Sequence, residues 1–170
     1  MKTKEMERVI AHFNKYFEQS DPLVYHTETE NPHVDVLVYP PAGAYPFWKL
    51  VSMGASDFAM PEKKPELGDR NEYILQVGPE EDLTDRKVLG RYAGWLLKAA
   101  RFAAQNHCYV TDGHSLEWKS DEGEAYCGAE LQLPEFVKDS RVLYCRLGLL
   151  KFAVCLQVRL LTKEEIDAKR

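Results

Sequence analysis

The chain of 170 residues has little of three features that mark large classes of proteins. Its four cysteines include no Cys-x-x-Cys pair, its longest apolar run is interrupted by Gln157 and Arg159, and its 22 basic residues are outnumbered by 27 acidic ones. These scarcities argue in turn against a zinc or disulfide framework, against a transmembrane helix, which needs roughly 20 apolar residues, and against a basic surface for nucleic acid.

The remaining composition is that of a globular protein. The length fits one domain over residues 1–170, and 45% hydrophobic content is enough for a buried core. Cys108, Cys127, Cys145 and Cys155 lie on or beside apolar segments, so we expect reduced thiols that act as small core residues. The charged segment Met1–Arg8 has no apolar signal region, so we expect a cytoplasmic protein. We expect no cofactor and no metal.

Three segments have helical patterns. Residues 3–19 place apolar side chains on one face and Glu5 on the polar face, and the stretch ends at Ser20-Asp21-Pro22. Residues 87–106 carry one narrow polar stripe on a wide apolar surface, so this helix should be covered on two sides. Thr162 and Glu165 have capping-box spacing, which predicts a short last helix.

Seven segments have strand patterns, rich in β-branched and aromatic residues and bounded by proline, glycine or acidic turns. They are residues 33–39, 47–53, 71–77, 115–118, 126–133, 142–146 and 151–161. Strands and helices therefore alternate as α, βββ, α, ββββ, α. This order predicts an α+β fold with a mixed, largely antiparallel β-sheet packed against helices.

One cluster has the residue types of a nucleophilic enzyme. Cys108, Asp112 and His114 lie within seven residues, so a Cys/His-dependent active site is one hypothesis. Catalytic groups are normally brought together from separate segments, and no strand-turn-helix elbow is present. Asp112-Gly113 is better interpreted as a turn in which Gly113 has a positive φ. We therefore expect no catalytic residue here.

A small-residue turn follows the strand at residues 47–53. We expect Gly54 to adopt a backbone conformation that other residues rarely adopt. The side chain of Ser56 or Asp57 is expected to form a hydrogen bond with a nearby main-chain group. Met60 then returns to the core. Arg70 and Glu72 are expected to pair with Asp57 across adjacent strands. We favour this structural interpretation over a direct binding role.

Four short motifs in this order resemble the suppressor of fused family. The first is Ser-x-Gly-x-Ser-x-x-x-Met, with Ser52, Gly54, Ser56, Asp57 and Met60. Arg70 and Glu72 fit the family's R-x-E-L strand, Gly113 and His114 fit its G-H-T/S turn, and residues 160–165 fit its P-L-T-x-E-E ending. Ala55 replaces a methionine often found after the glycine. Together the motifs cover roughly residues 30–168.

The resemblance implies a protein-binding function. Animal members bind a transcription factor of the Hedgehog pathway by strand addition and have a second, C-terminal domain, for which this chain has no room. The chain looks like the single-domain bacterial branch, whose members are associated with polymorphic toxin loci and are thought to be immunity proteins. Residues of the two-domain peptide clasp therefore cannot be transferred to this chain.

Our first hypothesis is a non-catalytic cytosolic protein-binding domain, an immunity protein that neutralises a cognate toxin. The net charge of −5 suits a basic partner. The candidate contact residues are Glu62, Glu66 and Asp69 in the loop at 58–71 and Glu80, Glu81 and Asp82 beyond the next strand, with the acidic segment at 121–124 as a further candidate. The alternatives are a regulatory or scaffold domain without a toxin, and the small enzyme described above. An unpaired edge strand would also permit a homodimer.

Overall fold

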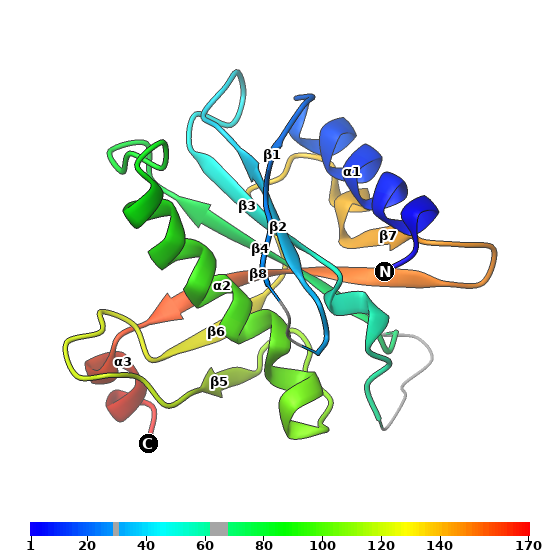
Figure 1. Cartoon of the computed structure of the whole chain (residues 1–170). Helices are drawn as coiled ribbons and strands as arrows, with labels where there is room; N and C mark the ends of the chain where they lie inside the picture. The colour runs from blue at the N-terminus through cyan, green and yellow to red at the C-terminus, as the bar shows by residue number, and fades with distance from the viewer. Residues whose placement is uncertain (29–30, 62–67) are drawn as a thin grey trace.

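The computed structural model describes residues 1–28, 31–61 and 68–170, and its described strands form one mixed sheet. In chain order the helices and strands are α1 (Thr3–Phe17), β1 (Leu23–Tyr25), β2 (Asp35–Tyr39), β3 (Trp48–Met53), β4 (Asn71–Val77), α2 (Arg86–Asn106), β5 (Ser115–Glu117), β6 (Gly128–Gln132), β7 (Tyr144–Arg146), β8 (Phe152–Leu161) and α3 (Lys163–Ala168). Single 3-10 turns, Ala55–Asp57 and Ser140–Leu143, follow β3 and precede β7 (Figure 1).

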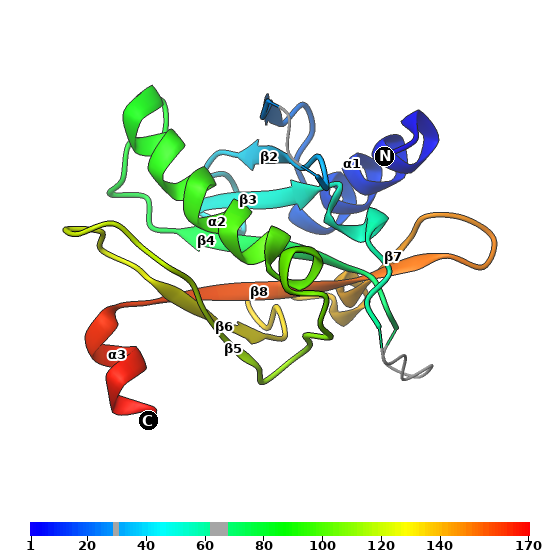
Figure 2. The same cartoon turned by 60° about the horizontal axis from the view of Figure 1, so that its bottom comes forward.

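The strand order is β1-β2-β3-β4-β8-β6-β5, and β7 pairs with the first part of β8. All pairs are antiparallel except β4 with β8, which are parallel and lie at the centre of the sheet. The α+β fold with a largely antiparallel sheet is therefore confirmed. Helix α2 connects β4 at the centre of the sheet to β5 at its edge. It therefore crosses one face of the sheet diagonally (Figures 1 and 2).

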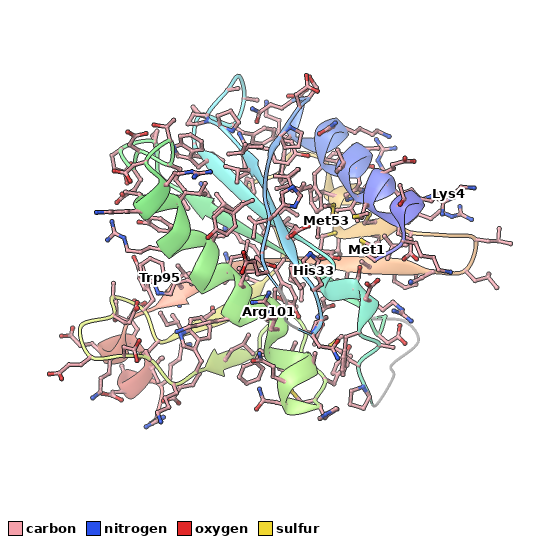
Figure 3. The ribbon with its side chains drawn as sticks, viewed as in Figure 1. Met1, Lys4, His33, Met53, Trp95 and Arg101 are labelled. Carbon is pink, nitrogen blue, oxygen red and sulfur yellow. The ribbon has the colours of Figure 1, made fainter. Side chains whose placement is uncertain are left out.

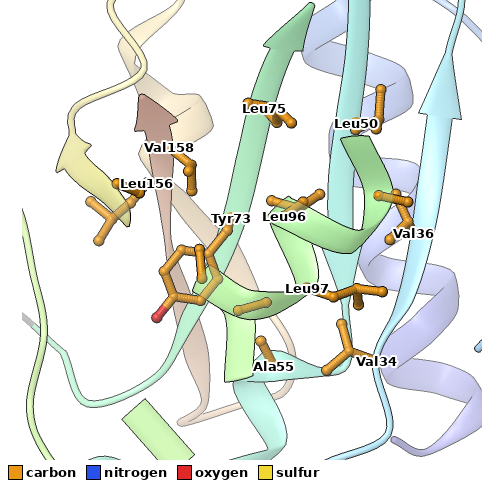
Figure 4. Close-up of a cluster of buried hydrophobic side chains, with 14 of the residues drawn as sticks. Val34, Val36, Leu50, Ala55, Tyr73, Leu75, Leu96, Leu97, Leu156 and Val158 are labelled. Atoms are coloured by element: carbon orange, nitrogen blue, oxygen red, sulfur yellow. The ribbon is translucent and has the colours of Figure 1, made fainter. Parts of the chain in front are cut away.

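Each strand of the sheet centre contributes to two cores, because successive side chains point to opposite faces. On one face α2 packs its Leu96 and Leu97 against β2, β3, β4 and β8 (Figure 4). On the other face Val9, Phe13 and Phe17 of α1 pack against the alternate residues of the same strands. Both faces of the central strands are therefore buried, which explains why their sequences are nearly continuous in apolar residues.

Apart from shifts of one or two residues at the ends of elements, the structure differs from the sequence-based expectations in three ways. Strand β1 was not predicted, because Leu23–Tyr25 is too short to show an alternating pattern. The segment at 142–146 begins as a 3-10 turn and becomes a strand only at Tyr144. Glu5, expected on the polar face of the first helix, is buried and forms an ion pair of 2.7 Å with Lys151.

Beneath the end of α1 lies a buried cation that no sequence pattern indicated. Lys49 of β3 is fully buried, and its Nζ donates to the main-chain oxygens of Pro40 at 3.0 Å and Tyr45 at 2.9 Å. The same Nζ lies 5.6 to 6.0 Å from the ring centroids of Phe17, Tyr45 and Phe47. Burial lowers the pKa of Lys49 to about 8.

This pKa predicts that the contribution of Lys49 to stability rises at alkaline pH. The unfolded lysine has a pKa of about 10.4, so between pH 8 and pH 10.4 it binds more protons in the unfolded chain than in the folded one, and its contribution to the free energy of unfolding increases with pH. The increase attributable to Lys49 is about 3 kcal/mol over this window.

The measurement is chemical unfolding of the wild type and of Lys49→Met at several pH values. The difference between the two proteins isolates the lysine, because every tyrosine and cysteine is present in both. We expect the wild type to gain stability relative to the variant between pH 8 and pH 10.4. Parallel stability curves would contradict the assignment.

Candidate functional site

The family-like turn surrounds a buried carboxylate. Glu72 of β4 is fully buried; its Oε1 accepts hydrogen bonds from Ser52 Oγ at 2.7 Å and the Ala55 amide at 3.2 Å. Its Oε2 accepts from the Gly54 amide at 3.1 Å and from the amide and Oγ of Ser56 at 3.1 and 2.5 Å. Five donors, one from the end of β3 and four from the turn after it, therefore converge on one side chain. We call Ser52, Gly54, Ala55, Ser56 and Glu72 the carboxylate clamp.

The clamp is inaccessible to a partner. Burial raises the pKa of the Glu72 carboxyl, and hydrogen bonds from Ser56, Ser52 and the turn backbone act in the opposite direction with smaller effect. Ser52 and Ser56 are also fully buried. Gly54 has a φ of +129°, and a Cβ at this position would lie 2.3 Å from the main-chain oxygen of His33, a residue labelled in Figure 3. The clamp thus joins β3, β4 and the start of β2, and its role is to hold the fold.

Two other motif residues secure the outer side of the turn. Arg70 donates to the main-chain oxygens of Ser56 at 2.7 Å and Asp57 at 3.1 Å. The expected pairing of Arg70 and Glu72 with the Asp57 side chain is wrong, because that carboxylate lies 2.6 Å from the amino group of Met1 and Glu72 faces the turn amides. Arg70 therefore acts on the turn backbone.

The last residue of the turn motif enters the core as expected. Met60 is buried, and its Sδ lies 3.6 Å from Asn71 Nδ2 and 3.4 Å from the Val110 amide. The same Asn71 Nδ2 donates to the Val110 main-chain oxygen at 3.0 Å and to the hydroxyl of Tyr73 at 3.2 Å. These contacts tie the turn to the segment that follows α2.

The Cys/His hypothesis receives no geometric support from the described residues. His114 Nδ1 accepts from the Thr111 amide at 3.1 Å, and Gly113 has a φ of +87°, as the turn interpretation predicts. Cys108 is half-buried, and burial raises the pKa of its thiol. No hydrogen bond joins Cys108, Asp112 and His114 within the described ranges. A thiol kept protonated and without a base is a poor nucleophile.

Two further kinds of site are absent from the part of the chain that the structure describes. Across residues 1–28, 31–61 and 68–170, no three histidine, cysteine or acidic side chains are arranged to hold a metal ion. None of the helices in this part of the chain is long and apolar enough to cross a membrane.

The acidic candidate residues do not form one surface. Glu62 and Glu66 lie outside the described residues. Asp69 precedes β4, whereas Glu80–Asp82 follows its other end, and a strand of seven residues spans about 23 Å. Two acidic regions at opposite ends of β4 are therefore separate candidates, and only the second is described in full.

The acidic segment after β4 is held in a fixed conformation. Burial raises the pKa of Tyr92 to about 12, and the nearby carboxylate of Glu81 acts in the same direction. Asp82 Oδ1 accepts from the amide and the hydroxyl of Thr84 at 3.0 and 2.5 Å, which lowers the pKa of Asp82. Glu80 is exposed. These carboxylates are presented by a pre-formed turn.

An apolar cavity of about 710 Å³ opens beside this acidic turn, between the edge strand β1 and the first turn of α2. Leu23 of β1, at its mouth, is 61% exposed. Asp21 lines the cavity, and Asp82 and Asp85 flank the lining residue Thr84 in the chain. The main apolar lining residues are Leu23, Val24, Tyr25, Trp48, Leu83 and Leu89. We call this cavity and its acidic border the β1 cavity. It could not be predicted from the sequence, because it depends on β1.

The fold and the carboxylate clamp together define a class: a mixed-sheet α+β protein whose Ser-x-Gly-x-Ser turn closes on a buried glutamate. The sequence model of the suppressor of fused protein (SUFU) family matches residues 30–170, and the chain belongs to this family. The match contains every described residue of the clamp.

A solved structure gives the same fold. The crystal structure of a protein described as a suppressor of fused homologue from Neisseria gonorrhoeae superimposes with a TM-score of 0.68 at 14% sequence identity, over 99% of this chain and 83% of that one. No curated protein matches the chain. Domains of the SUFU family mediate protein–protein interaction and are generally not enzymes.

Proposed function

We propose that the chain is a non-catalytic cytosolic protein-binding domain with a basic protein as its partner, and that it serves as an immunity protein against a cognate polymorphic toxin. The observation that carries the binding role is the β1 cavity, where an apolar hollow, an edge strand and a fixed acidic turn adjoin one another. Apolar hollows with a few placed polar groups are the usual form of a binding site.

Charge supports a basic partner. Asp21 and Arg86 line the cavity, the turn with the exposed Glu80 and Asp82 leads in the chain to the lining residues Leu83 and Thr84, and the whole chain carries a net charge of −5. Complementary charge at the border of an interface speeds association and excludes wrong partners more than it adds affinity. A cationic toxin domain fits this arrangement.

The toxin role derives from the likeness to single-domain bacterial members of the family. A regulatory or scaffold protein with no toxin partner would have the same cavity and the same clamp. Gene neighbourhood separates the two hypotheses, because an immunity gene lies beside the gene of its toxin. We expect an adjacent gene for a large secreted protein with a variable C-terminal region, and its absence would favour the scaffold role.

Capture from the native host tests the binding role directly. The tagged protein is expected to retain one basic protein at near-stoichiometric amount, identified by mass spectrometry. The matched bait carries Leu23→Asp, which places a charge at the mouth of the β1 cavity without disturbing a buried side chain, and it should lose this partner. Equal recovery on both baits would contradict the use of the cavity.

A further inference from the structure

A second cavity, of about 600 Å³, lies between α2 and the end of β5, two elements that are neighbours in the fold (Figure 1). Small-molecule sites have volumes of about 300–1,000 Å³, so this cavity has the size of such a site. The residues that matter here are Gly94, Lys98, Arg101 and Phe102 of α2, Glu117 of β5, and Trp118 and Lys119 directly after it. We call this space the α2 cavity. It is separate from the β1 cavity, because the two share no lining residue.

The charge of the α2 cavity is opposite to that of the whole chain. Its lining contains three cations, Lys98, Arg101 and Lys119, and one carboxylate, Glu117. Arg101 is buried and is labelled on α2 in Figure 3. Glu117 forms an ion pair with Arg170. Lys98 and Lys119 have no carboxylate within ion-pair distance among the described residues. Two lysines can therefore attract an anionic group to the cavity.

Aromatic rings line the α2 cavity from both of its sides. Phe102 comes from α2 and Trp118 from the segment after β5, and both side chains are half-buried. An aromatic ring offers a flat face on which a second planar ring can stack, and neighbouring cations strengthen the binding of a ring that carries an anionic group. The cavity thus combines surfaces for a planar ring with positive charge for an anion.

One residue of the cavity wall is not required by the fold. Gly94 lies in the middle of α2, where glycine is less favourable than alanine. A Cβ at this position would meet no atom within 4 Å, so no close contact demands a glycine. The missing side chain does keep the cavity open at this point. A ligand that occupies the cavity would explain why the helix carries an unfavourable residue here.

We propose that the α2 cavity binds a small molecule that joins a planar aromatic ring to a phosphate, of the chemical class of the nucleoside monophosphates. The ring would pack against Phe102 and Trp118 beside Gly94, and the phosphate would face Lys98 and Lys119. A phosphate carries a charge between about −1.5 and −2 at neutral pH, so it matches a pair of lysines better than a single carboxylate does. This ligand differs from the basic protein proposed for the β1 cavity, and neither proposal depends on the other.

The first test is calorimetric titration with adenosine 5′-monophosphate (AMP) as the probe. Adenosine lacks the phosphate, and ribose 5-phosphate lacks the base, so the two fragments test the two halves of the site separately. We expect saturable binding of AMP to one site. Each fragment should bind about tenfold more weakly or worse, because stacking and charge both contribute to affinity.

A cavity-filling variant separates binding in the cavity from general attraction to the surface. Leucine favours a helix more than glycine does, so Gly94→Leu should keep or raise the melting temperature while it occupies the open space. We expect its affinity for AMP to fall by about tenfold or more. The control is Gly90→Ala in the same helix, where the new Cβ would lie 3.8 Å from the hydroxyl of Tyr25, an ordinary contact. It should change affinity by less than about twofold.

A charge-reversal pair tests the two lysines. Lys98→Glu with Lys119→Glu should weaken the binding of AMP by about tenfold or more. The matched control, Lys87→Glu with Lys163→Glu, changes the net charge equally at exposed positions outside the cavity. It should alter affinity by less than about twofold.

Several results would overturn the proposal. They are no saturation by AMP at about 1 mM, binding of adenosine or ribose 5-phosphate as tight as that of AMP, or full affinity in the lysine double variant or in a folded Gly94→Leu. Single-stranded oligoadenylate that binds more tightly per nucleotide than AMP would also overturn it. That result would show a site for nucleic acid, since aromatic rings beside cations stack the bases of single strands.

Discussion

Glu72→Gln is expected to lower the free energy of unfolding by about 3 kcal/mol. The glutamine amide can face the clamp in two ways. If its nitrogen replaces Oε2, it meets the fixed amides of Gly54 and Ser56; if it replaces Oε1, it meets the fixed amide of Ala55. A main-chain amide can only donate a hydrogen bond, and the side-chain nitrogen of glutamine cannot accept one. At least one buried amide is therefore left unpaired in either orientation.

Chemical unfolding at neutral pH measures this loss, and Glu135→Gln is the matched control. Glu135 is exposed, so the same change there should alter stability by less than about 0.5 kcal/mol. If Glu72→Gln were as stable as the wild type, the turn would not depend on the carboxylate. Its structural role would then have to be abandoned.

Gly54→Ala is expected to destabilise the protein by about 4 kcal/mol, enough to prevent accumulation of folded protein if the wild type is of ordinary stability. Two costs add at this position. The φ of +129° is closed to alanine, and the new Cβ would lie 2.3 Å from the main-chain oxygen of His33. Neither the backbone at Gly54 nor that at His33 can move away easily, because the clamp holds the first and the pairing of β2 holds the second.

Gly113→Ala separates these two costs. Gly113 also has a positive φ, +87°, but a Cβ there meets no atom within 4 Å. Backbone strain alone should cost about 1 kcal/mol. The measurement is the thermal unfolding of both variants under the same conditions, and equal effects at the two glycines would show that the contact with His33 is unimportant.

Strong periodicity made the main helices and strands predictable. Residues 71–77 and 86–106 are long, apolar and bounded by proline, glycine or a capping aspartate, and the structure places β4 and α2 there within one residue of the expected bounds. Helix α3 likewise follows from its capping box, which the structure contains. Local patterns were sufficient because local and tertiary preferences agree in these segments.

Elements that depend on distant partners were not predictable. Strand β1 exists because β2 offers it an edge, and three residues show no period of their own. Glu5 and Lys49 look like surface residues in the sequence, yet tertiary contacts with Lys151 and with main-chain oxygens hold them in the interior. The sequence gives residue types and spacing, whereas pairing across 146 positions is a property of the fold.

The candidate site also combines features that the sequence predicts with features that depend on distant contacts. The sequence motifs contain Ser52, Gly54, Ser56 and Glu72, but only the structure shows that Glu72 is enclosed by the turn and does not pair with Asp57. The surface that we propose for a partner lies elsewhere, in the β1 cavity. This cavity adjoins the edge strand β1, whose three residues leave little trace in a sequence.

The central claim is that the chain binds a basic protein through the β1 cavity and the acidic turn at residues 80–82 beside it. The most direct test is calorimetric titration of the captured partner into the wild type, into Glu80→Lys with Asp82→Lys, and into Glu164→Lys with Asp167→Lys on α3, which has the same net charge. The account predicts that affinity falls by about tenfold or more for the first pair and by less than about twofold for the α3 pair. Equal affinities for the two pairs would contradict it.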